Sequence, residues 1–155
     1  MTLSVIRGCS MKYAYSEMYL SDVQKNLGFF FQAALHNLSL PVDQVQKAFL
    51  ASEIPMQIEF ANPNFLCGKS GYELAIIAFP QFEKKLLESI DEPFYPQAEY
   101  WSGHVLAYYQ WISGKIFTEI LGKYPLERIL SDYRLMHEAD ITKMVAMMDA
   151  VITPP

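Results

Sequence analysis

The segment from Tyr100 to Ile112 constrains the fold more than any other part of the chain, because as a helix it has almost no polar side. On a helical wheel, one arc of about 100° holds five ring-bearing residues: Tyr100, Trp101, His104, Tyr108 and Trp111. Aliphatic residues continue around most of the circumference, and only Ser102, Gly103 and Gln110 are weakly polar. Other elements must cover such a helix on nearly all sides, so we expect it in the middle of a bundle.

The rest of the chain also carries helix start and stop signals. Ser21 to Gln24 and Ser70 to Glu73 match the capping box, and Asp140 is a suitable N-cap. Gly114 and Gly122 are expected to end helices. The helices predicted from these signals and from apolar spacing cover residues 21–38, 41–52, 56–60, 70–79, 82–90, 97–112, 115–121, 125–133 and 141–152. The fold class predicted is therefore all-α, a single-domain bundle of seven to nine helices.

The domain is expected to run from residue 11 to residue 155, since 155 residues suit one ordinary domain. Residues 1–10 have no helical period and precede Met11-Lys-Tyr-Ala-Tyr, which resembles a natural start, so we expect this N-terminal extension to contribute little to stability. Asp91 to Pro96 is the clearest loop. If the chain has a hinge, we expect it at 91–97.

The apolar runs are too short for a membrane span, which needs about 20 residues. The longest are Leu74 to Phe79 and Val105 to Tyr109. The N-terminus lacks the pattern of a signal peptide, and Cys9 and Cys67 form no C-x-x-C pair, so both are expected to be free thiols. These features predict a cytoplasmic protein with no membrane contact.

The charge distribution disfavours a nucleic-acid partner. The net charge is −5, with seven basic and ten acidic groups in residues 1–96 and five and seven in residues 97–155. Phosphate binding requires clustered Lys and Arg. A helix-turn-helix could be drawn over 115–134, but its second helix would carry as many acidic as basic groups, whereas groove-reading helices have surplus positive charge.

No residue pattern predicts catalysis, a metal or a cofactor. The three histidines, His36, His104 and His137, are far apart, and only His137 has a second ligand type nearby, in Asp140. The carboxylates are scattered, so no acid/base pair can be named. Gly68-Lys69-Ser70 resembles the end of a phosphate-binding loop, but Pro63 stands where the loop needs its first glycine. A capped helix after an ordinary loop is the favoured interpretation.

The ring-bearing stripe of the central helix has two interpretations. Trp101, His104, Tyr108 and Trp111 are the candidate binding residues if the stripe forms a pocket or partner groove with one titratable group. The alternative is a core in which hydroxyl, indole and imidazole groups satisfy one another. We favour the core, and Trp101, Tyr108 and Trp111 are then expected to be largely buried.

The last predicted helix has an apolar arc of about 160°, wider than the roughly 100° of a one-sided surface helix. Flexible methionines suit a surface that must fit a second molecule. Met144, Met147, Met148 and Val151 are therefore candidates for an interface with another protein or a second copy of the chain. The alternative is a terminal helix wedged between two others of the same bundle.

Several motifs resemble a known family. These are Asn62-Pro63 with Gly68 to Ala75, and Tyr100 to Gly103 with Leu106 to Trp111. They resemble a family of small uncharacterised proteins from anaerobic gut bacteria, associated with accessory gene cassettes of the toxin–antitoxin kind. The resemblance covers the chain from Met11 onward and implies a partner-binding protein, without a known reaction or ligand.

Together these features predict a non-enzymatic protein-interaction module, a regulatory or antitoxin-like partner protein. The alternative from another class is a small-ligand-binding or enzymatic helical domain with an aromatic pocket around His104. A pocket lined by Trp101, His104, Tyr108 or Trp111 would favour the alternative, and a filled bundle would count against it.

Overall fold

The computed structural model describes residues 13–93 and 95–155, and every regular element in them is helical. The eleven α-helices are α2 (Leu20–Gln32), α3 (Val42–Ala51), α4 (Ile54–Glu59), α5 (Pro63–Leu66), α6 (Gly71–Ala78), α7 (Glu83–Ser89), α8 (Ala98–Ser113), α9 (Phe117–Lys123), α10 (Leu126–Ser131), α11 (Tyr133–Met136) and α12 (Ile141–Ile152). The predicted all-α class is confirmed. The count exceeds the predicted seven to nine because the four-residue helices α5 and α11 were not anticipated.

Three tighter or wider helical turns join these elements: η1 (Glu17–Tyr19) and η3 (Pro80–Phe82) are 3₁₀ turns, and η2 (Ala33–Asn37) is a π-helical turn that extends α2. None of the described helices is both long and apolar enough to cross a membrane.

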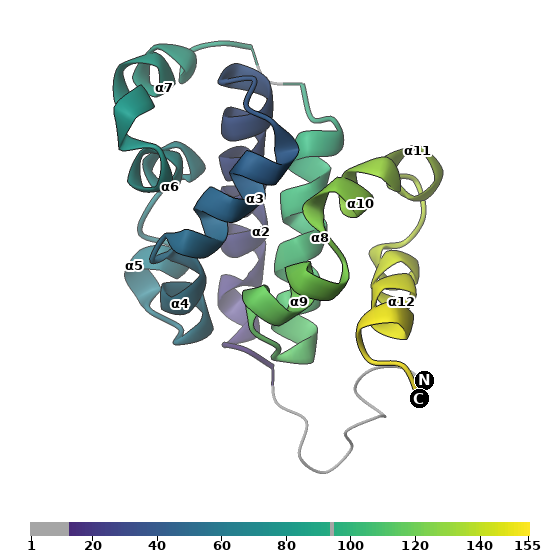
Figure 1. Ribbon diagram of the computed structural model, residues 1–155. Helices are drawn as coiled ribbons and strands as arrows, with labels where there is room; N and C mark the ends of the chain where they lie inside the picture. Colours follow the sequence, from purple (N-terminus) through teal and green to yellow (C-terminus); the bar gives the residue numbers. More distant parts are fainter. Residues whose placement is uncertain (1–12, 94) are drawn as a thin grey trace.

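The helices α2 and α8 lie side by side at the centre of the molecule (Figure 1). Their backbones approach closely at Gly103, where an added Cβ would stand 2.2 Å from the Leu27 carbonyl oxygen. The positions predicted to be the weakly polar side of α8 are therefore not solvent-facing: Ser102 and Gln110 are 0% and 1% exposed. Ser102 Oγ donates to the backbone oxygen of Glu99 (2.7 Å) and Gln110 Nε2 to that of Lys115 (3.0 Å), so each of these buried side chains has a partner for a donor.

The other helices form two groups around the central pair. In Figure 1, α5, α6 and α7 lie on one side, α10, α11 and α12 lie on the other, and α3 passes in front. The buried apolar side chains of both groups belong to one core. The described chain is thus a single domain. The Asn37 side-chain amide on η2 donates to the carboxylate of Glu92, a residue of the segment after α7 (2.7 Å). A hinge at 91–97 stays a prediction.

Three of the predicted helix ends are confirmed by the structure. Ser70 forms the predicted capping box with Glu73, Asp140 caps α12 by accepting from the Thr142 amide, and Gly114 ends α8 with a left-handed φ of 69°. The predicted box at Ser21 is wrong, because Ser16 caps η1, which runs directly into α2. Gly122 lies inside α9 and does not end it.

The first described residues bind to the end of α8 through hydrogen bonds and ring stacking. The Ala14 amide donates to the Trp111 carbonyl (2.9 Å), and the Trp111 indole N–H donates to the Tyr15 carbonyl (2.8 Å). The Tyr13 ring stacks on Trp111 with centroids 4.1 Å apart. We call these four residues the N-terminal clamp. The predicted extension, residues 1–10, lies outside the described residues.

Candidate functional site: an aromatic pocket between α8 and α11

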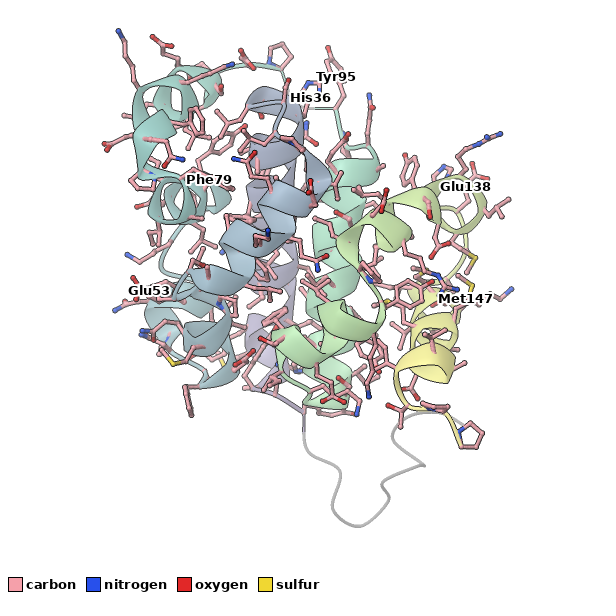
Figure 2. The ribbon with its side chains drawn as sticks, viewed as in Figure 1. His36, Glu53, Phe79, Tyr95, Glu138 and Met147 are labelled. Atoms are coloured by element: carbon pink, nitrogen blue, oxygen red, sulfur yellow. The ribbon has the colours of Figure 1, made fainter. Side chains whose placement is uncertain are left out.

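The beginning of α8 and the short helix α11 border an open pocket of about 210 Å³. Its lining comes from the loop before α8, from α8 and from α11: Pro96, Gln97, Tyr100, Trp101, His104, Tyr133 and His137. Figure 2 labels a sequence neighbour of the lining on each side of the pocket. Tyr95 precedes the lining residue Pro96 near the start of α8, and Glu138 follows the lining residue His137 just after α11. We call this cavity the aromatic pocket.

The rings of the aromatic pocket support one another. Trp101 and Tyr133 meet edge to face with centroids 5.6 Å apart and planes at 72°, which joins α8 to α11. Tyr133 stacks on His137 at 4.2 Å, and Tyr100 lies nearly parallel to His104 at 6.3 Å. Both of these pairs have the i, i+4 spacing that places side chains on one helix face. The walls are therefore held by contacts between the lining rings themselves.

His104 is held by a partner on α2. The Gln24 side-chain amide donates to His104 Nε2 at 3.1 Å, so this nitrogen accepts and the proton of the neutral ring is on Nδ1. Burial lowers the pKa of His104, which favours the neutral form. Nδ1 itself is buried and has no hydrogen-bond partner in the described part of the chain.

Aromatic rings and imidazoles make up most of the lining. It contains no carboxylate, thiol or aliphatic hydroxyl, and its titratable groups are the imidazoles of His104 and His137 and the hydroxyls of Tyr100 and Tyr133. Within residues 13–93 and 95–155, no three His, Cys, Asp or Glu side chains gather closely enough to hold a metal ion. What the pocket does present is ring surface, which stacks on planar groups and attracts cations.

Only two of the four candidate binding residues lie at the pocket. Trp101 and His104 line the pocket, whereas Tyr108 and Trp111 lie farther along α8 and do not. Trp111 is 4% exposed in the N-terminal clamp, as the prediction of a buried ring required. Trp101 and Tyr108 are partly buried and pack against the core, so the predicted burial is complete only for Trp111.

Sequence reasoning missed the α11 side of the pocket. Tyr133 and His137 are four positions apart on one helical face, which is a detectable signal, but the neighbour of that face is set by the packing of the whole chain. Tyr100 belongs to the predicted stripe but is not among the four predicted binding residues. The site therefore combines one predicted element with one that only the tertiary structure supplies.

The candidate interface on α12 is largely part of the core. Met144 and Met148 are 0% exposed, because α12 packs against both α8 and α9 and these contacts occupy its wide apolar arc. This is the wedged arrangement given above as the alternative. Met147 is half-buried and Val151 is 37% exposed, so only these two remain at the surface, and Figure 2 labels Met147 on α12.

A larger hollow of about 480 Å³ borders the segment Gly68-Lys69-Ser70. The Ser70 amide is already occupied by the Glu73 carboxylate at 2.9 Å, and helix α5, not a strand, precedes the segment. Both Lys25 and Glu92 line the hollow, so its charge is mixed. These features agree with the interpretation of a capped helix and not with a phosphate-binding loop.

The chain was also compared with known proteins. No family model matches it, and neither the curated proteins nor the solved structures contain a match. The geometry of the aromatic pocket is therefore the main guide to function, and the resemblance to gut-bacterial proteins stays a prediction.

Proposed function

We propose that the protein is a non-enzymatic cytoplasmic interaction module that captures one side chain of a partner protein in the aromatic pocket. The observation that carries this proposal is the size and lining of the pocket. Its volume of about 210 Å³ is below the roughly 300–1,000 Å³ of sites for drug-sized ligands. A ring-lined cavity of this size matches the pockets in which an interface buries a single anchoring residue.

An exposed aromatic side chain next to the pocket supports the same proposal. Tyr95, which precedes the lining residue Pro96, is 69% exposed. Large apolar side chains with this much exposure near a concave site are typical of protein-binding surfaces. Tyr95 would supply contact area beside the anchoring residue. The resemblance to toxin–antitoxin cassettes would make the partner one that this protein regulates or neutralises.

The alternative of a small-ligand-binding or enzymatic domain has less support. The pocket is small for a free metabolite that must be held by its own contacts, and its lining contains no carboxylate, thiol or aliphatic hydroxyl. Native mass spectrometry of the purified chain distinguishes the two, because a bound metabolite would add a fixed mass.

The proposal is tested by quantitative affinity capture from the source organism, followed by binding measurements with the purified partner. Tyr133→Ala and Trp101→Ala remove pocket walls, and Phe60→Ala is the matched control, because Phe60 is an aromatic residue 79% exposed outside the pocket. We expect the pocket variants to weaken binding by about 30-fold, as at an interface hot spot, and the control to bind normally. Equal binding by all variants would refute the role of the pocket.

A further inference from the structure

We infer that the aromatic pocket selects a cationic side chain of its partner, with arginine preferred over lysine. This inference rests on the proposed function and specifies the chemistry that the pocket recognises. It follows from three features: the ring faces of the lining, the acidic residues next to it in sequence, and the state of His104.

The lining presents the π surfaces that cations prefer. A cation within about 6 Å of an aromatic centroid is attracted by the negative face of the ring, most strongly for Trp and Tyr. Tyr100, Trp101 and Tyr133 provide three such rings around one cavity of about 210 Å³. The same chemistry already operates elsewhere in the molecule, where the Arg128 guanidinium lies 4.4 Å from the centroid of Tyr124.

The charges beside the pocket favour the same occupant. No Lys or Arg lines the cavity. Two acidic residues, Glu99 and Glu138, are next in sequence to the lining residues Tyr100 and His137, and the Glu138 carboxylate lies 3.8 Å from His137 Nε2. This local field draws a cation and repels a carboxylate.

His104 does not oppose a cation. It accepts a hydrogen bond from Gln24 and is neutral, because burial lowers its pKa. A partner aspartate or glutamate would find no Lys or Arg in the lining, and a partner tryptophan would gain nothing from the acidic neighbours of the pocket. Arginine is preferred to lysine because its planar guanidinium stacks on ring faces and is more weakly hydrated.

The inference is tested by NMR titration of the purified full chain with single-residue probes. The probes are the N-acetyl methylamides of arginine, lysine, tryptophan and glutamate, together with that of citrulline, the neutral isostere of arginine. The readouts are the Trp101 indole N–H signal, assigned with Trp111→Phe, and the His104 and His137 ring signals. We expect saturable shifts with arginine at about millimolar concentration, and affinity for citrulline lower by about tenfold.

Variants locate the binding. Tyr133→Ala should abolish the arginine-dependent shifts, Tyr133→Phe should keep them because the ring remains, and Phe60→Ala should leave them unchanged. If citrulline or tryptophan binds as well as arginine, the preference for a cation is wrong while the pocket still binds side chains. If no probe shifts the pocket signals, the inference is overturned. The proposed function fails separately, when capture of the partner is insensitive to Trp101→Ala and Tyr133→Ala.

Discussion

Trp111 joins the first described residues to the end of α8. Its ring is 4% exposed, stacks on Tyr13 and donates a hydrogen bond to the Tyr15 carbonyl. We expect Trp111→Ala to lower the free energy of unfolding by about 3–5 kcal/mol, the range for removing a large buried ring, as measured by urea denaturation. Trp111→Phe should cost less because it keeps a ring. A cost for the alanine variant below about 1 kcal/mol would show that the clamp adds little.

His104 makes a pH-dependent contribution that can be isolated by mutation. Burial lowers its pKa in the folded chain from the ordinary value of 6.5. As the pH falls below 6.5, the unfolded chain takes up a proton at His104 before the folded chain does, so the free energy of unfolding decreases. The decrease is complete once the pH is below the folded pKa. Above 6.5 the residue is neutral in both states and has no such effect.

We therefore expect His104→Gln to lose less stability than the wild type between pH 7.5 and pH 5, in urea denaturation at both values. His36→Gln serves as the control, because His36 is exposed on η2. If the wild type and His104→Gln lose the same amount of stability on acidification, the imidazole is not protected by burial.

At the scale of single residues, the sequence predicted part of the candidate site. The periodicity of α8 correctly placed Trp101 and His104 on one face, because spacing along a helix is a local property. It could not show that this face meets Tyr133 and His137, since that depends on where α11 packs. It also could not show which rings would face outward, because every side of α8 is apolar or small.

Among the elements, the crossing of α2 and α8 depends on the absence of one side chain. A Cβ at Gly103 would approach the Leu27 carbonyl oxygen to 2.2 Å and the Gly28 nitrogen to 2.6 Å, and both of these are backbone atoms. Gly103→Ala should force the helices apart and cost about 3 kcal/mol or more in unfolding free energy.

The matched control for this substitution is Gly122→Ala. Gly122 is exposed within α9, and an added Cβ there meets no atom within 4 Å. Alanine should therefore raise the stability by about 0.5–1 kcal/mol through its higher helix propensity. Thermal and urea unfolding of both variants check the pair, and a well-tolerated Gly103→Ala would show that the two backbones can separate without penalty.

The helix boundaries that were predicted well are those with a side-chain cap or a left-handed glycine, at Ser70, Asp140 and Gly114. The boundaries that were missed have other causes. Each of the helices α5 and α11 has only four residues, too few to show a period. Ser21 matches a capping pattern, but the preceding 3₁₀ turn already supplies the start of α2.

At the scale of the whole molecule, the exposed residues of α12 bear on the oligomeric state. The outer face of α12 still presents Met147 and Val151. If copies of the chain associate there, light scattering at micromolar concentration should give more than the mass of one chain, and Met147→Glu should reduce it to that mass. Leu87→Glu is the control, at a residue 50% exposed on α7. A wild type with the mass of one chain at every concentration would refute self-association.

The pairing of α2 with α8 also sets the order in which the protein can fold. Gln24 and His104 are 80 positions apart, and Tyr15 and Trp111 are 96 apart. Contacts between residues so distant in sequence are slow to form, because a long loop must close first. At about 5–20 residues per second, a ribosome needs roughly 4–16 s to add those 80 residues. During that interval Leu27, which is fully buried and packs against Gly103 of α8 in the finished fold, lacks its α8 partner, and we expect the nascent chain to depend on chaperones.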